Sequence, residues 1–283
     1  MRAKKRFGQH FLVDQTIGRR LVSAIQLEPD SVVIEIGPGR GALTKVLLQR
    51  PCRVIAVEVD DELTRALQIE LADQIHAGKL VLIAQDILKT NLDELLQQHH
   101  IDGKVRILGN LPYNIATAIL QHLIAFRQQI DDMTIMLQRE VVDRILSQPG
   151  TKQYGYLSVL MQYFCEGRKL FTVSPGAFRP VPKVTSTVVQ LKVRERPAVE
   201  VADEAHFLRV VSALFMERRK TIMNNLKRMP LRWDGERIAG RLRHVGIDPS
   251  RRAETLSLEE FARVANALRA SAGDRFDNLL SVG

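Results

Sequence analysis

The sequence predicts an α/β fold, in which an open, mostly parallel sheet of seven strands is covered by helices and followed by a small helical domain. From Val32 onward, short β-branched runs alternate with longer segments of helical period, the pattern of a parallel sheet with crossover helices. The last two strand-like runs have no helix between them, so they should pair antiparallel. After Pro197 the strand signals stop and only helical spacing continues.

The elements follow in order along the chain. The expected strands are residues 32–36, 53–59, 80–84, 105–108, 133–137, 169–173 and 187–193. The expected helices between them are residues 43–48, 62–75, 92–98, 117–126, 141–147 and 156–164. Helical spacing then runs over residues 204–269, with breaks at Pro230 and Asp248-Pro249. We therefore expect a first domain of residues 1–195 and a second of residues 196–283, whose last stretch, 271–283, should fray.

Composition favours a polyanionic partner. The formal net charge is +9, and Lys and Arg that neutralise phosphates release counterions, although a solvated basic face is an equal alternative. Cys52 and Cys165 match no metal-ligand spacing and are too few for a disulfide framework, and the seven histidines lack ligand spacing, so no metal site is expected. No stretch approaches the roughly 18 apolar residues of a membrane span, which leads us to expect a cytoplasmic protein without a membrane partner.

A glycine-rich turn follows the first predicted strand. Gly37, Gly39 and Gly41 lie where the backbone of such a turn must approach a bound ligand closely. The spacing departs from the dinucleotide fingerprint, which requires glycine where Ala42 stands, so NAD is disfavoured. The turn indicates a nucleotide-type ligand, with a purely steric use of glycine as the alternative.

Carboxylates end the next two strands. Glu58 lies 21 residues beyond Gly37, where a carboxylate can accept hydrogen bonds from both ribose hydroxyls. Asp86 follows the third strand and is placed to accept from an adenine amino group while Ile87 or Leu88 packs on the ring. Each carboxylate taken singly is more often a helix N-cap or a loop charge. Three strand ends in register favour a ligand site, because ligands of open α/β sheets bind beyond the carboxyl ends of the strands.

The decisive motif is Asn110-Leu111-Pro112-Tyr113, directly after the fourth strand. If Asn110 Oδ1 and the Leu111 carbonyl both accept from an aromatic NH2, the nitrogen lone pair is drawn out of the ring and can attack a methyl group. Pro112 stiffens the turn, and Tyr113 offers a stacking face for an unpaired base. The alternative is a plain Asn-x-Pro turn that caps the next helix.

A second aromatic candidate is Phe178 in Phe178-Arg-Pro180-Val-Pro182. The two prolines fix an extended backbone beside the ring, so Phe178 is expected to form the other wall of the base pocket. A rigid connection with Phe178 in the core is the competing interpretation.

With these residues identified, the sequence resembles the KsgA (RsmA) family of rRNA adenine N6,N6-dimethyltransferases from about Arg6 to Leu268. The resemblance rests on motifs at both ends and in the middle of the chain: Phe7-Gly-Gln-His-Phe-Leu12, Glu35-Ile-Gly37-Pro-Gly39, Glu58, Asp86, Asn110-Leu-Pro-Tyr113, Phe178-Arg-Pro-Val-Pro-Lys-Val184, Phe215-Met-Glu-Arg-Arg-Lys-Thr221, Asn224-Asn-Leu226 and Arg252-Ala-Glu-Thr-Leu-Ser257. The last three are the most discriminating.

The resemblance implies a Rossmann-like class I S-adenosylmethionine-dependent methyltransferase sheet with a C-terminal rRNA-binding domain. It implies double methylation of two adjacent adenosines near the 3′ end of small-subunit rRNA, in the assembling 30S subunit, by a protein expected to be a monomer. Implied cofactor contacts come from His10, Leu12, Gly37, Gly39, Glu58, Asp86 and Asn110. Many family members have Asn where His10 stands. Implied contacts to rRNA phosphates come from Arg2, Lys4, Lys5, Arg6, Arg218, Arg219, Lys220, Lys227 and Arg228.

Three other functions stay open at this stage. A methyltransferase of large-subunit rRNA adenine shares the fold and the Asn-Leu-Pro-Tyr motif. A DNA N6-adenine methyltransferase is disfavoured, because those enzymes usually carry Pro where Leu111 stands. A non-catalytic assembly factor or a transcription-factor relative would need the basic surface but not Asn110.

Overall fold

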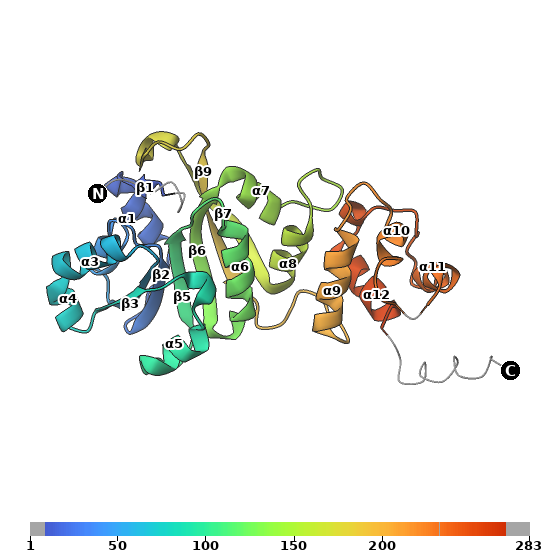
Figure 1. The fold of residues 1–283 in the computed structure, drawn as a ribbon, viewed down its shortest axis with the longest axis horizontal. Helices are drawn as coiled ribbons and strands as arrows, with labels where there is room; N and C mark the ends of the chain where they lie inside the picture. Colours follow the sequence, from blue (N-terminus) through green and yellow to red (C-terminus); the bar gives the residue numbers. More distant parts are fainter. Residues whose placement is uncertain (1–8, 232, 270–283) are drawn as a thin grey trace. The chain divides into compact units, whose positions relative to one another are not determined.

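The computed structural model describes residues 9–231 and 233–269 (Figure 1). These residues form two compact units. The first contains the described residues up to Asp143 together with Phe164–Glu195, and the second contains Arg144–Tyr163 together with the described residues from Arg196 onward. Residues 144–163, which the sequence assigns to the first domain, thus belong to the second unit. The expected fraying of residues 271–283 concerns a stretch outside the described residues.

One sheet organises the first unit. Its strands are β2 (Ser31–Ile36), β3 (Cys52–Glu58), β4 (Leu80–Ala84), β5 (Val105–Asn110), β6 (Ile130–Gln138), β7 (Cys165–Val173) and β9 (Ser186–Val193). Their order across the sheet is β4-β3-β2-β5-β6-β9-β7. The strands from β4 to β6 pair in parallel, and β9 runs antiparallel to both β6 and β7. The predicted seven-stranded sheet, mostly parallel with an antiparallel end, is confirmed.

Helices precede and connect the parallel strands. They are α1 (Gln15–Ser23), α2 (Thr44–Leu47), α3 (Asp61–Glu70), α4 (Ala72–His76), α5 (Leu92–Gln98) and α6 (Ala116–Ala125). The chain crosses between the units within α7 (Arg139–Ile145) and at the end of α8 (Tyr156–Phe164). The single helix expected over residues 62–75 was wrong, since the backbone breaks at Leu71. The break leaves both Leu67 and Leu71 in the core.

The central strands are buried on both faces. Val33 and Val54 pack in one core cluster with residues of α1, α2 and α3. Their neighbours Ile34 and Ile55 point to the opposite face and are fully buried as well. Strands covered on both sides have no polar face, which is why they appear in the sequence as continuous apolar runs.

The second unit is helical. Its further helices are α9 (Glu204–Leu214), α10 (Ile222–Leu226), α11 (Gly235–His244) and α12 (Leu258–Ala267). Each begins at a residue whose side chain accepts a backbone N–H: Asp203, Thr221, Asp234 and Ser257. The predicted helical region is confirmed, with one more break than expected, between α9 and α10. Within residues 9–231 and 233–269, no helix has the length and apolar character needed to cross a membrane.

Candidate functional site

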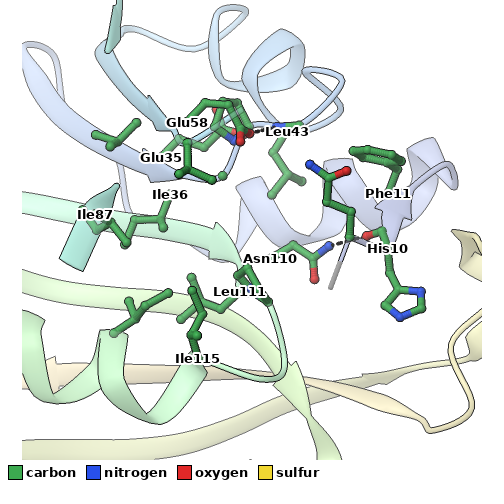
Figure 2. Close-up of a pocket in the computed structure, with 18 of the residues that line it drawn as sticks. His10, Phe11, Glu35, Ile36, Leu43, Glu58, Ile87, Asn110, Leu111 and Ile115 are labelled. Atoms are coloured by element: carbon green, nitrogen blue, oxygen red, sulfur yellow. Dashed lines mark hydrogen bonds between the residues drawn. The ribbon is translucent and has the colours of Figure 1, made fainter. Parts of the chain in front are cut away.

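A cavity of about 270 Å³ opens at the carboxyl ends of β2, β3, β4 and β5. Because these strands are parallel neighbours, their carboxyl ends meet at one edge of the sheet. The cavity brings together all but one of the predicted catalytic and cofactor residues: His10, Leu12, Gly37, Gly39, Glu58, Asp86, Asn110, Leu111, Pro112 and Tyr113. Segments from Gln9 to Ile119 therefore converge on a single site (Figure 2).

The glycine turn forms one wall of the cavity. Gly37 and Gly39 adopt φ values of 66° and 59°, a left-handed backbone that side chains disfavour. A Cβ on Gly37 would meet no atom within 4 Å, so this backbone faces open space. A Cβ on Gly39 would lie 3.1 Å from the Phe11 ring. The turn is thus shaped for close approach by a ligand on one side and by the N-terminal segment on the other.

Glu58 fastens the glycine turn to the end of β3. One carboxyl oxygen accepts the Gly39 N–H at 3.0 Å, and the other accepts the Asp60 N–H at 3.0 Å. The side chain is buried, and burial raises the pKa of the Glu58 carboxyl above its ordinary value, against the lowering effect of these two bonds. Each oxygen retains a second lone pair for a ligand hydroxyl. Glu58 is therefore both part of the scaffold and available to a ligand.

Glu35, near the end of β2, is a site residue that the sequence analysis did not assign. Its carboxyl lies at the cavity wall, and Oε2 is buried without a hydrogen-bond partner. Burial, with a contribution from the nearby charge of Glu58, raises the pKa of the Glu35 carboxyl to about 7. The signal in the sequence that could have identified Glu35 is an acidic residue within an apolar strand. Oε2 is thus a buried polar atom without a partner, while Thr44 hydrogen-bonds the carboxyl and opposes part of the rise in its pKa.

Asp86 begins the short 3-10 helix Ile87–Lys89, and its Oδ1 accepts the Leu88 N–H at 3.0 Å. The alternative considered from sequence, a helix N-cap, is therefore part of its role. Asp86, Ile87 and Leu88 all line the cavity. An apolar floor beside a carboxylate is the arrangement that a purine ring with an amino group requires.

Asn110 ends β5, and its amide is oriented by a single contact. Asn110 Nδ2 donates to the main-chain oxygen of His10 at 3.0 Å (Figure 2). A carbonyl can only accept, so this contact identifies the nitrogen side of the amide and leaves Oδ1 as the remaining acceptor. The next residue, Leu111, donates its N–H to the Met136 carbonyl at 3.1 Å, while its side chain is buried. Asn110 is half-buried at the cavity, whereas Leu111 is only 1% exposed as a whole residue.

Tyr113 is anchored at its hydroxyl, which forms a 2.6 Å hydrogen bond with Ser186 Oγ. Its ring stacks on the imidazole of His10, with centroids 5.5 Å apart and planes at 26°. Partial burial raises the pKa of the Tyr113 hydroxyl, so the side chain is neutral over the physiological range. Tyr113 thus presents a fixed aromatic face at the cavity.

The N-terminal segment reaches the cavity through a strand that the sequence did not predict. β1 (Phe11–Leu12) pairs antiparallel with β8 (Phe178–Arg179). Gln9 Nε2 donates to Asp60 Oδ2 at 3.3 Å, and the Arg40 guanidinium lies 4.6 Å from the centroid of the Phe11 ring. The segment therefore contacts both the end of β3 and the glycine turn.

Phe178 corrects one expectation. Its side chain is fully buried in the core cluster with Leu12, and it is not among the residues that line the cavity. The ring has no exposed surface in this structure that a base could stack on. The structure places Phe178 where the competing interpretation put it, in the core.

Five of the basic residues predicted to bind rRNA lie in the second unit, and three of them, Arg218, Arg219 and Lys220, line a surface hollow together with Glu217. Two of the five already have partners. Arg218 Nη2 donates to the carbonyls of Lys152 and Tyr154 at 2.7 and 3.2 Å, and Arg228 forms an ion pair with Glu217. Arg219, Lys220 and Lys227 are exposed. The basic residues at positions 2 to 6 lie outside the described residues.

Residues 9–231 and 233–269 contain no group of three or more His, Cys, Asp or Glu side chains that could hold a metal ion. At the cavity, Glu58 and Asp86 accept backbone N–H groups.

Similarity to known proteins covers nearly the whole chain. A family model described as "Ribosomal RNA adenine dimethylase" matches residues 1–270. The chain is 40% identical over 273 residues to a ribosomal RNA small subunit methyltransferase A of Geobacter metallireducens, covering 96% of this chain and 98% of that one. It is 42% identical over 268 residues to a protein of the same name from Bacillus cytotoxicus, covering 94% and 91%.

Solved structures show the same architecture. The 23S rRNA methyltransferase ErmE superposes with a TM-score of 0.66 at 25% identity, over 91% of this chain and 99% of that one. A dimethyladenosine transferase from Plasmodium falciparum gives a TM-score of 0.74 at 22% identity, over 90% and 96%. The latter likeness establishes the fold.

Proposed function

This chain belongs to the ribosomal RNA adenine dimethylase family, and from that premise we propose that it dimethylates the N6 amino groups of two adjacent adenosines near the 3′ end of small-subunit rRNA. The observation that carries the proposal is the Asn110 amide, which is held by its nitrogen so that its oxygen remains the free acceptor at the cavity. Two relatives at 40% and 42% identity are named as small-subunit methyltransferases, which supports the choice of subunit.

S-adenosylmethionine, when bound, supplies the methyl group from its sulfonium. The residues of the cavity fit it: Glu35 Oε2 lacks a partner, the Gly37 backbone faces open space, and Glu58 and Asp86 retain acceptor lone pairs. We assign the ribose hydroxyls to Glu58 and the adenine amino group to Asp86. The remaining contacts of the proposal come from Leu12, Gly37, Gly39, Asn110 and the main chain of His10.

Asn110 and Leu111 prepare the substrate nitrogen. The N6 lone pair of adenine is delocalised into the ring, which makes this nitrogen a poor nucleophile. When Asn110 Oδ1 and the Leu111 carbonyl each accept one N–H, the nitrogen becomes tetrahedral and its lone pair is aimed at the methyl carbon. With S-adenosylmethionine bound, its methyl group would be transferred to this nitrogen, the thioether would leave, and the nitrogen would lose one proton to water. No strong base is required.

Tyr113 supplies the stacking face that holds the unpaired base, an interaction worth about 1–3 kcal/mol. Pro112 restricts the turn between the acceptors and this ring. Exposed Arg219, Lys220 and Lys227 bind rRNA phosphates in this proposal and fix register without reading sequence. We expect a cytoplasmic monomer that acts on the assembling small subunit.

Likeness to the 23S enzyme ErmE over most of the chain makes large-subunit rRNA the second candidate substrate. The test is to incubate the purified protein with unmethylated small and large subunits and radiolabelled S-adenosylmethionine, and to locate the product by primer extension and mass spectrometry. We expect two dimethylated adenosines in small-subunit rRNA. Label confined to the large subunit would favour the second candidate, and no label in either would favour a non-catalytic assembly role.

Substitution of Asn110 tests the chemistry. We expect Asn110→Ala to lower the single-turnover rate at least a hundredfold, on the scale of losing one preorganised polar group at the reacting atoms. Cofactor affinity, measured by calorimetry, should fall far less than the rate, because Asn110 is only one of several cofactor contacts and Glu58 and Asp86 are untouched. An equal loss of rate and affinity would contradict the role assigned to Asn110.

A further inference from the structure

His10 joins three parts of the site that are distant in sequence. Its main-chain oxygen accepts from Asn110, its ring stacks on Tyr113, and its Nδ1 lies 2.8 Å from the Pro180 carbonyl. The resemblance to known enzymes assigns this position a cofactor contact, but the ring is directed away from the cofactor carboxylates and toward Pro180. Figure 2 shows the main-chain contact to Asn110 on one side of His10 and the ring on the other.

The ring contact has a defined direction. The Pro180 oxygen can only accept, so Nδ1 must carry the hydrogen. This bond ties residue 10 to the loop that follows β8. The ladder between β1 and β8 contains only two residue pairs, Phe11 with Arg179 and Leu12 with Phe178. His10 lies beyond the end of that ladder, so its ring provides the next attachment.

The position of the His10 main chain determines how Asn110 is held. Asn110 Nδ2 has the His10 oxygen as its acceptor, and rotation of the amide about its last bond would exchange Nδ2 for Oδ1. Two carbonyl-type oxygens facing each other would repel, so the contact opposes that rotation. If residue 10 moves, the amide loses the contact that keeps Oδ1 as the free acceptor.

We propose that His10 is a positioning residue: its Nδ1–H bond to Pro180 fixes the main-chain oxygen that orients the Asn110 amide toward the substrate amino group. This inference rests on the proposed function, since it deepens the role of the same site. The hydrogen bond to Pro180, and not the stacking of the ring on Tyr113, positions the main-chain oxygen of His10. The imidazole acts through Asn110 and makes no contact with the reacting atoms.

Three variants separate the bond from the ring. His10→Asn keeps an N–H donor at the same number of bonds from the main chain as Nδ1 but removes the ring. His10→Phe keeps an aromatic surface against Tyr113 but removes the donor. His10→Ala removes both. Each is purified as the full chain, and its free energy of unfolding in urea is measured first, so that a folding defect is recognised.

The variants are compared by single-turnover methylation of unmethylated small subunits and by calorimetric binding of S-adenosylmethionine. We expect His10→Ala and His10→Phe to react about tenfold to thirtyfold more slowly and His10→Asn within threefold of the wild type, because small misplacements of an orienting group have effects of this order. Cofactor affinity should change less than threefold in all three. A wild-type rate in His10→Ala, rescue by Phe but not by Asn, or a parallel loss of cofactor affinity would each overturn the proposal.

A second measurement is independent of any rRNA substrate. In protein labelled with 15N at asparagine, the Asn110 side-chain NH2 signals are assigned by their loss in Asn110→Ala, and their hydrogen exchange is measured. Exchange should be slow in the wild type and in His10→Asn and at least fivefold faster in His10→Ala and His10→Phe. If the wild type methylates neither subunit, the proposed function fails, and these exchange rates still decide whether His10 holds Asn110. Equal exchange in all four proteins would refute it.

Discussion

Glu35→Gln offers a quantitative test of how the cavity is built. The Glu35 carboxyl is buried, its Oε2 has no hydrogen-bond partner, and burial raises its pKa from an ordinary value of 4.5 to about 7. Between these values the folded state holds a proton that the unfolded state has lost. The free energy of unfolding therefore falls as the pH rises through this window, and the loss is complete above the folded value.

The magnitude follows from the two pKa values. Each pH unit between the unfolded and folded pKa values of Glu35 corresponds to about 1.4 kcal/mol. At high pH, the ionised Glu35 carboxyl therefore makes the folded protein about 3 kcal/mol less stable than a neutral group at this position would. About 2 kcal/mol of this develops between pH 5.5 and pH 8.5. Glutamine has nearly the shape of the protonated acid and does not ionise, so the variant should gain that amount relative to the wild type over this range.

The assay is urea unfolding of the cofactor-free wild type and variant at pH 5.5, 7.0 and 8.5, followed by circular dichroism. Only the change with pH in the difference between the two proteins is used, because any fixed effect of the amide then cancels. Glu70→Gln is the matched control, since Glu70 is half exposed and pairs with Lys45 at the surface. A difference for Glu35→Gln that stays constant within about 0.5 kcal/mol would refute the argument, because the expected change is about four times larger.

Five further substitutions test the site and its scaffold. Phe178→Ala should lower the free energy of unfolding, measured in urea, by about 3–5 kcal/mol, as for other buried aromatic residues. A variant that is as stable as the wild type but stacks the base less well would instead show that Phe178 forms a wall of the base pocket. Gly39→Ala should destabilise the protein by about 1–2 kcal/mol, because the φ of Gly39 is 59°. Gly240→Ala, at an exposed position of α11 with open space around its Cα, should stabilise the protein by about 1 kcal/mol. Arg218→Ala should lower the melting temperature, because the two carbonyls that Arg218 binds lose their partner. Arg219→Ala should lower the affinity for small subunits in filter binding and leave the melting temperature unchanged. The opposite pattern would contradict the structural role of Arg218 and the rRNA-binding role of Arg219.

Local patterns in the sequence determined the sheet and most of its site. Apolar runs, helical spacing and the glycine turn depend on neighbouring residues, and parallel strands necessarily bring their carboxyl ends to one edge. For that reason Gly37, Glu58, Asp86 and Asn110 were found from the sequence, and all four line the cavity. The nature of the catalytic motif also follows from its residue types.

Only the tertiary structure decided how distant segments meet. The pairing of β1 with β8 joins residues more than 160 positions apart, and no local pattern encodes it. Phe178 of β8, which the sequence had assigned to the base pocket, is buried in a core cluster built from several elements. Packing likewise engages Arg218 with carbonyls of Lys152 and Tyr154. The type of a side chain determines which groups it can bind. Which of those groups it contacts depends on segments that only the folded structure brings together.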